Sequence, residues 1–222
     1  TINNYYAQTN LKARHDNYLT QLLRTATYGT VPASLGNGLI AYAKENEAKR
    51  AEMLPRLTSA IDGAYGSLYA PLEKEVLTAQ LNLYAAKAAE YGLAPKVAEM
   101  KAANNGDFTN DVHKAVTSSI FTSKDAVLAF LKEPKVETIT NDPLYVISND
   151  LMTKIRAKSP EQTKADDDFA IAFRKLVEGL RESKLNTIQY PDANSTLRLT
   201  YGKVRSLPAD KRKDAKINNY TT

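Results

Sequence analysis

Apolar residues recur at three- and four-residue spacing through most of this chain, and this spacing constrains the fold more than any other feature. Leu77, Leu81 and Tyr84 fall on one side of a helix, because an α-helix completes a turn about every 3.6 residues. The pattern begins at Leu72 and ends near Gly92, where glycine suits a left-handed C-terminal cap. We therefore predict a mainly α chain of irregularly arranged helices, with one short strand near the C-terminus.

Two later helices have clear start signals. Asp142-Pro143 and Ser159-Pro160 each place a capping residue before a first-turn proline, and Gln162 completes a capping box at the second site. The apolar residues that follow on one face are Leu144, Ile147, Leu151 and Ile155 in the first helix, and Phe169, Phe173, Leu176, Val177 and Leu180 in the second.

Other helices have weaker signals. The stretch 38–52 is rich in Ala, Lys and Glu, which predicts an exposed helix, and we expect a kink or a restart at Pro55 because proline lacks a backbone donor. A shorter helix is predicted over 124–132, where Thr122 and Asp125 form a capping-type pair.

The period changes from helical to two-residue alternation after Asn186. Polar and apolar residues alternate over 196–201, which indicates a half-buried strand. A single strand leaves its backbone groups unpaired and rarely stands alone. Its partner is therefore expected either at 136–140 or in a neighbouring part of a longer protein. The chain begins with Thr1, and we expect it to be a processed or excised piece of such a protein.

Charge and composition exclude several classes of protein. The 222 residues include no cysteine, so thiolate metal sites, disulfides and a cysteine nucleophile are excluded.

Of the net charge of +5, the segment 203–216 supplies +4, from six basic and two acidic residues. A basic tail in solvent is favoured over a nucleic-acid-binding surface, which would spread over the folded domain. The apolar runs are shorter than the roughly 20 residues that a transmembrane helix needs, and we expect no signal peptide within this chain.

No motif supplies catalytic chemistry. Gly36-Asn37-Gly38 resembles a dinucleotide loop but lacks the preceding strand, which favours a flexible loop leading into a helix. The run 166–168 is three aspartates, whose side chains point about 100° apart on a helix and cannot all face one cation. His15 and His113 are the only histidines, and both are predicted to be ordinary surface or helix-end residues. We predict no catalytic residue, no metal site and no cofactor.

One segment carries more specific information. Residues 190–204, Tyr-Pro-Asp-Ala-Asn-Ser-Thr-Leu-Arg-Leu-Thr-Tyr-Gly-Lys-Val, closely resemble a signature stretch of the bacterial serine dipeptidyl peptidases typified by dipeptidyl peptidase 7 and dipeptidyl peptidase 11. The segments 73–81, 119–124 and 130–134 resemble the same family in the same order. The resemblance extends from about residue 38 to the C-terminus.

This resemblance implies a fold and an activity. Members of the family are periplasmic or cell-surface exopeptidases that release dipeptides from free peptide N-termini. Their catalytic Ser, His and Asp lie on a chymotrypsin-like double β-barrel, and an inserted helical domain covers the cleft. The family's Gly-Asn-Ser-Gly motif is absent here. The resemblance therefore implies a helical cap domain over 1–189, with a re-entry strand and basic tail over 190–222 directed toward a barrel that the sequence lacks.

The resemblance also implies one binding residue. In the family, an Asn within an Asn-Tyr-Trp-Lys-Asn run of the helical domain binds the substrate's α-ammonium group. The most similar segment here is Asn4-Tyr5-Tyr6, whereas Thr27-Tyr28 has better spacing but no Asn. Asn4 is the candidate substrate-binding residue, and the alternative is that it only begins a helix.

The predicted function is that of a non-catalytic helical domain of a periplasmic serine dipeptidyl peptidase. It would cover the active-site cleft and help to bind the free N-terminus of peptides. The alternative is a free-standing helical binding or scaffold protein related to that insert. The predicted partners are a peptide N-terminus and the parent barrel, with no nucleic acid and no membrane span. The oligomeric state, a homodimer included, is left open.

Overall fold

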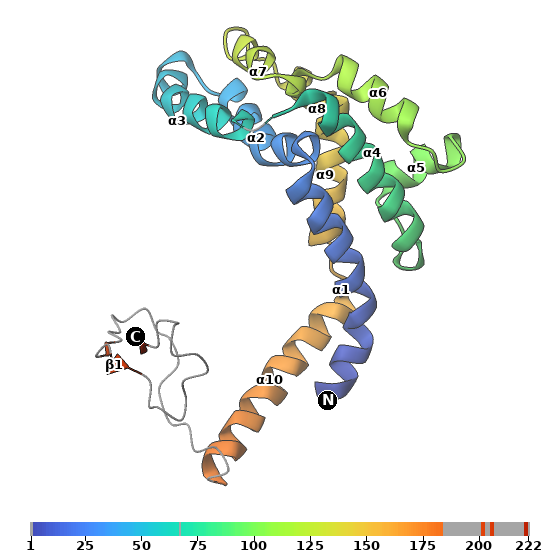
Figure 1. The fold of residues 1–222 in the computed structure, drawn as a ribbon, viewed down its shortest axis with the longest axis vertical. Coiled ribbons are helices and arrows are strands. Elements are labelled where there is room, and N and C mark those ends of the chain that lie inside the picture. Colours follow the sequence, from blue (N-terminus) through green and yellow to red (C-terminus); the bar gives the residue numbers. More distant parts are fainter. Residues whose placement is uncertain (1, 67, 184–200, 203–204, 207–219, 222) are drawn as a thin grey trace. The chain divides into compact units, whose positions relative to one another are not determined.

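The protein, seen in a computed structural model, is mainly α, as predicted. The structure describes residues 2–66, 68–183, 201–202, 205–206 and 220–221. Its α-helices (Figure 1) are α1 (Ile2–Thr25), α2 (Thr27–Lys44), α3 (Glu47–Tyr65), α4 (Ala70–Lys87), α5 (Pro95–Ala103), α6 (Thr109–Ser118), α7 (Lys124–Phe130), α8 (Val136–Thr140), α9 (Pro143–Arg156) and α10 (Pro160–Glu182). Two 3-10 turns, η1 (Ala89–Tyr91) and η2 (Ile120–Thr122), join them.

The chain divides into two compact units, Thr1–Lys175 and Leu176–Thr222, with the boundary inside α10. The first unit contains α1 to α9 and the larger part of α10. The second contains the end of α10 and the described strands β1 (Arg205–Ser206) and β2 (Tyr220–Thr221), which pair antiparallel. Of the strand predicted over 196–201, only Tyr201 lies within the described residues, and it is not in a strand.

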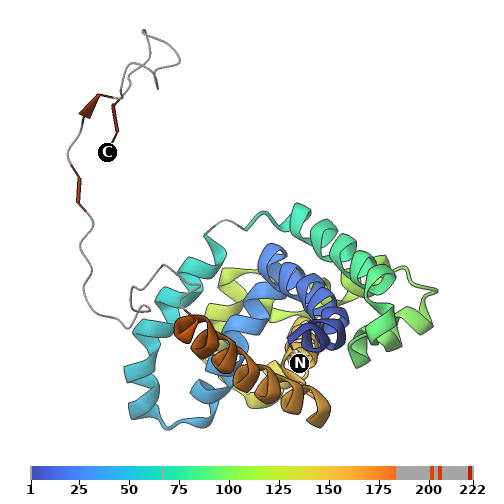
Figure 2. The same cartoon turned by 90° about the horizontal axis from the view of Figure 1, so that it is seen from below.

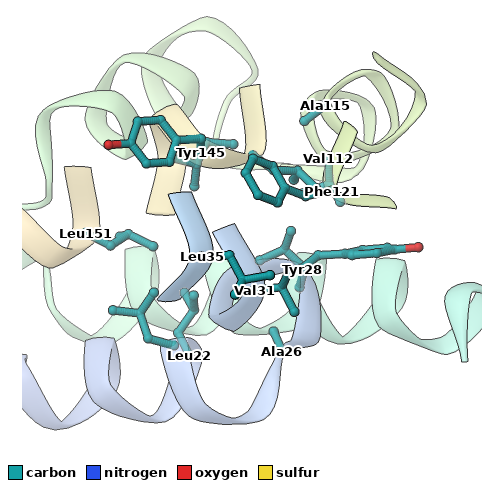
Figure 3. Close-up of a cluster of buried hydrophobic side chains, with 14 of the residues drawn as sticks. Leu22, Ala26, Tyr28, Val31, Leu35, Val112, Ala115, Phe121, Tyr145 and Leu151 are labelled. Atoms are coloured by element: carbon teal, nitrogen blue, oxygen red, sulfur yellow. The ribbon is translucent and has the colours of Figure 1, made fainter. Parts of the chain in front are cut away.

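The core of the first unit is built around α2. This helix contacts α1, α3, α4, α8 and α9, and Figure 3 shows Tyr28, Val31 and Leu35 of α2 between side chains of the surrounding helices. Leu39, also on α2, has no exposed surface. Fully burying an aliphatic side chain of this size contributes about 1.5–3 kcal/mol, so α2 is stabilised chiefly by what packs around it.

The expectation of a flexible loop at Gly36-Asn37-Gly38 is wrong, because all three residues lie inside α2. Gly36 faces the ring of Tyr145 on α9 so closely that a Cβ atom there would collide with it. The Tyr145 hydroxyl donates to the Asn37 side-chain oxygen at 3.0 Å. Glycine disfavours a helix by about 1 kcal/mol, but here it permits the close approach of α2 and α9.

The exposed helix predicted over 38–52 is confirmed as helical, but it is not one helix and not exposed throughout. It is divided between α2 and α3, and Tyr42 is buried while its hydroxyl donates to the Leu131 carbonyl at 3.3 Å. Asn46 is the N-cap of α3, with its side chain accepting from the Lys49 N–H at 3.1 Å. α3 continues through Pro55 without a restart. Asn46 is a capping signal that the sequence contains, but a prediction based on the Ala, Lys and Glu content of the stretch does not use it.

The two strongest start signals are confirmed. The Asp142 carboxylate accepts from the Leu144 and Tyr145 N–H groups at the start of α9, at 3.0 and 3.1 Å. Ser159 Oγ accepts from the Gln162 N–H at 3.2 Å, and Gln162 Oε1 accepts from the Ser159 N–H at 3.1 Å, which completes the capping box of α10. Asp142 also accepts from Ser119 Oγ at 2.8 Å and so joins the start of α9 to η2.

Three smaller predictions have mixed outcomes. α4 ends at Lys87 and η1 follows, with Gly92 as the C-cap of η1 at a φ of +91°. Its ψ of 127° differs from the left-handed helical conformation that the predicted cap requires. α7 begins at Lys124, but its N-cap is Ser123 rather than Thr122. The candidate strand at 136–140 is wrong, because these residues form α8. No helix in the described part of the chain combines the length and apolar character needed to cross a bilayer.

Candidate functional site

The most unusual polar group in the first unit is His15, which is buried in α1. Only 2% of its surface is exposed, so the prediction of a surface or helix-end histidine is wrong for this residue. Leu19, Leu22 and Leu23 follow at spacings of four, seven and eight residues and are buried with it. That spacing places His15 on the apolar face of α1, and it is the sequence signal that could have predicted the burial.

A chain of hydrogen bonds fixes the protonation of His15. A carboxylate oxygen can only accept, so the neutral ring is assigned to donate to Asp16, and its Nε2 then accepts from the Tyr84 hydroxyl at 3.0 Å, while the hydroxyl oxygen accepts from the Ala94 N–H at 2.9 Å. His15 Nδ1 therefore carries the ring proton and donates to Asp16 Oδ1 at 3.0 Å. The network joins α1 to α4 and to the residue before α5.

The surroundings of His15 keep the imidazole neutral. Burial lowers the pKa of His15, and the positive charges of Lys154 and Lys12 act in the same direction against the opposing effect of Asp16. Burial also raises the pKa of Tyr84 to about 12. The ring of Tyr91 lies against the imidazole, with centroids 4.6 Å apart.

This geometry does not suit His15 for general-base catalysis. A base needs a free ring nitrogen within hydrogen-bonding distance of the nucleophile, and Nε2 of His15 already accepts from Tyr84. The other histidine, His113, is exposed on α6, with Nδ1 3.2 Å from Lys74 Nζ, which confirms the surface prediction for that residue. His15 therefore joins α1 to α4 through its hydrogen bonds, and His113 contacts Lys74 at the surface.

The first turns of α1 lie beside α10 (Figures 1 and 2). Side chains of the two helices line a groove next to this network. Its volume is about 710 Å³. Tyr5 holds the two helices together: its hydroxyl donates to Asp166 Oδ1 at 3.0 Å, and its ring stacks on Phe169 with centroids 4.3 Å apart. Lys12 and Asp16, which form an ion pair, also line the groove, so it extends to the Asp16 partner of His15.

The structure places the predicted site residues as follows. Asn4 is exposed on the first turns of α1, but Asn3 and Tyr5 rather than Asn4 line the groove. Asp166 and Asp168 pair with Lys158 and Lys164. Among the described residues, no group of three or more His, Asp or Glu side chains is arranged to hold a metal ion. The sequence did not indicate the groove, because each of its walls appears in the sequence only as a polar helix face.

Comparisons with known proteins find one matching family model and several similar sequences. The family model described as Peptidase S46 matches residues 1–222. Dipeptidyl-peptidase 7 of Capnocytophaga gingivalis is 36% identical over 222 residues, which cover 98% of this chain and 30% of that protein. The Asp/Glu-specific dipeptidyl-peptidase of Porphyromonas gingivalis is 31% identical over 136 residues, covering 61% of this chain and 19% of that protein. Dipeptidyl-peptidase 7 of Phocaeicola vulgatus is 32% identical over 138 residues, with the same coverage.

Proposed function

Because the chain belongs to the peptidase S46 family, we propose that it acts as a non-catalytic helical cap domain of a serine dipeptidyl peptidase. The chain spans 30% of the length of the Capnocytophaga relative that it matches almost end to end. The single observation that carries the proposal is the state of His15. The one buried histidine in the described residues has its Nε2 occupied by Tyr84, so these helices lack a free imidazole base in their core.

In this proposal residues 1–189 cover the active-site cleft, and 190–222 lead toward a chymotrypsin-like barrel that bears the catalytic triad. The domain would lie in the periplasm or at the cell surface, where members of this family act. Its substrates would be peptides with a free N-terminus. The exposed position of Asn4 supports a contact with the substrate amine, because a side-chain amide oxygen can accept from an ammonium group.

A direct test is to incubate the 222-residue chain with dipeptidyl chromogenic substrates. We expect no turnover above the uncatalysed rate, because the described part of the chain supplies no histidine base with a free ring nitrogen in its core to activate a nucleophile. Turnover that is lost in His15→Ala and retained in His113→Ala would place a catalytic base in this chain and overturn the proposal.

The binding role needs a second measurement. We expect the chain to bind a peptide with a free α-amine more tightly than its N-acetylated form. Asn4→Ala should abolish that difference, whereas Asn149→Ala, a change of another exposed asparagine, on α9, should preserve it. A difference that survives Asn4→Ala would remove Asn4 from the amine site.

A further inference from the structure

The groove between α1 and α10 has walls of different chemistry. Tyr5 and Tyr6 form an aromatic wall on α1, and Gln162 and Asp166 come from α10. Ligand sites in proteins commonly have volumes of about 300–1,000 Å³, and the groove, at about 710 Å³, lies within this range. It is large enough for several residues of a polypeptide.

The charges in the groove cancel. Lys12 pairs with Asp16, and Lys158 pairs with Asp166 at 2.6 Å, so each lining cation already has a carboxylate partner. A nucleic acid or another polyanion is bound chiefly by cations whose charge is available to phosphate. The groove therefore favours a ligand that is polar but has no net charge along its length.

The lining also provides hydrogen-bonding groups at a regular interval. Asn3 and Asn10 both line the groove and are exposed. Seven residues of α-helix separate them by about 10.5 Å along the axis, which equals about three residues of extended polypeptide. Each side-chain amide can both donate and accept, as a peptide unit of the backbone does.

An apolar surface lies between these amides. Tyr6 is 59% exposed. Its ring meets Tyr5 edge-on at 5.5 Å and Phe169 at 5.7 Å, which holds the ring in place. A large aromatic side chain that is fixed and still exposed is typical of a recognition surface, and here it would contact the side chains of a bound chain.

We propose that this groove is a peptide-binding subsite that holds an extended polypeptide by its main chain. The inference rests on the proposed function in one respect: the bound segment would be the part of a peptide substrate that follows the N-terminal dipeptide. Main-chain recognition makes the subsite tolerant of sequence. It also makes binding there independent of the α-amine, unlike the amine contact proposed for Asn4.

The test uses the 222-residue chain and N-acetylated, C-amidated octapeptides of mixed polar and apolar sequence, with binding measured by calorimetry or by NMR chemical-shift perturbation. We expect binding that perturbs the amides of α1 and the first turns of α10. Tyr6→Ala should weaken it about tenfold, since aromatic residues commonly dominate such contacts. Asn3→Ala combined with Asn10→Ala should weaken it by a similar factor.

The matched controls are Tyr69→Ala and Asn149→Ala. Tyr69, at the N-cap of α4, is 65% exposed and does not line the groove. Its replacement by Ala should therefore leave binding unchanged. Circular dichroism of each variant identifies any that fail to fold. If Tyr6→Ala unfolds the chain, Tyr6→Ser and the double asparagine variant carry the test.

The outcomes separate the subsite from the proposed function. Binding of free-amine peptides with no binding of acetylated ones would overturn the subsite and leave the cap-domain proposal standing. Binding of acetylated peptides by a chain that shows no preference for a free amine would support the subsite and contradict the amine contact. Tighter binding of a single-stranded oligonucleotide, weakened by salt and by Tyr6→Ala, would also overturn the proposal.

Discussion

Helices α2 and α10 obtain their stability from opposite sources. α2 has nine buried residues although it contains Pro32 and its N-cap, Ala26, makes no side-chain capping bond. α10 begins with a complete capping box and contains no buried residue. Short helices are marginal by propensity alone and depend mostly on tertiary packing. The comparison shows that a strong local signal and a place in the core are separate properties of a helix.

The largest expected effect comes from removing a core side chain of α2. Leu39→Ala should lower the free energy of unfolding by about 2–5 kcal/mol, because a fully buried leucine leaves a cavity when it is truncated. Leu176→Ala, at a leucine of α10 that is 46% exposed, should change it by less than about 0.5 kcal/mol. Urea denaturation followed by circular dichroism measures both. Equal losses would contradict the comparison.

The same substitution should have opposite signs in the two helices. Gly36→Ala should destabilise by about 1–3 kcal/mol, because the new methyl group collides with the buried Tyr145 ring. At Gly179 on α10 nothing lies near the added Cβ, so Gly179→Ala should stabilise that helix by up to about 1 kcal/mol. Denaturation curves test the first change and hydrogen exchange of the α10 amides tests the second. Gly63→Ala, at an open position of α3, is the control within the first unit.

The capping box should matter only locally. Ser159→Ala removes the acceptor for the Gln162 N–H and should cost about 1 kcal/mol. Since α10 has no buried residue, the loss should appear as faster hydrogen exchange in its first turn, with the unfolding of α2 unchanged. Ser159→Asp, which keeps a capping oxygen, should restore protection. Faster exchange throughout α1 to α9 would show that α10 supports the core.

The smallest expected effect concerns pH. Burial lowers the pKa of His15 from its usual 6.5, so below about pH 6.5 the unfolded chain binds a proton that the folded chain resists. The associated stability is fully present above that pH and is lost as the pH falls toward the lower folded pKa. Unfolding free energies measured between about pH 7.5 and pH 5 should therefore fall more steeply in the wild type than in His15→Gln.

His113 provides the matched control for this prediction. It is exposed on α6, so His113→Gln should leave the pH dependence of the wild type intact. An identical slope in the wild type and in His15→Gln would show that the Tyr84–His15–Asp16 network does not govern acid stability.

Some features of the fold could be predicted because their causes are local. The caps at Asp142 and Ser159 act on backbone donors within three residues, and the positive φ at Gly92 follows from a helix end. The burial of α2 could not be predicted in this way. Its glycines and proline have a loop-like composition, and the helix is stabilised by packing against α1, α3, α4, α8 and α9, with the Tyr145 ring close against Gly36.

The candidate site also has features that could be predicted from the sequence and features that could not. The absence of a catalytic motif and the family resemblance could be seen in the residues alone. The burial of His15 could have been inferred from its spacing to the leucines of α1. The groove could not, because Tyr5 and Asp166 are 161 positions apart and meet only through the packing of α1 against α10.

The sequence by itself determined that the chain is helical, where its best-capped helices begin, and which family it belongs to. These properties depend on the spacing of apolar residues, on capping bonds between near neighbours and on short sequence motifs. Only the tertiary structure decided which helix forms the core, that His15 is neutral and enclosed, and that a groove exists beside it. Those properties arise from contacts between residues far apart in the chain, where burial and close approach outweigh local preference.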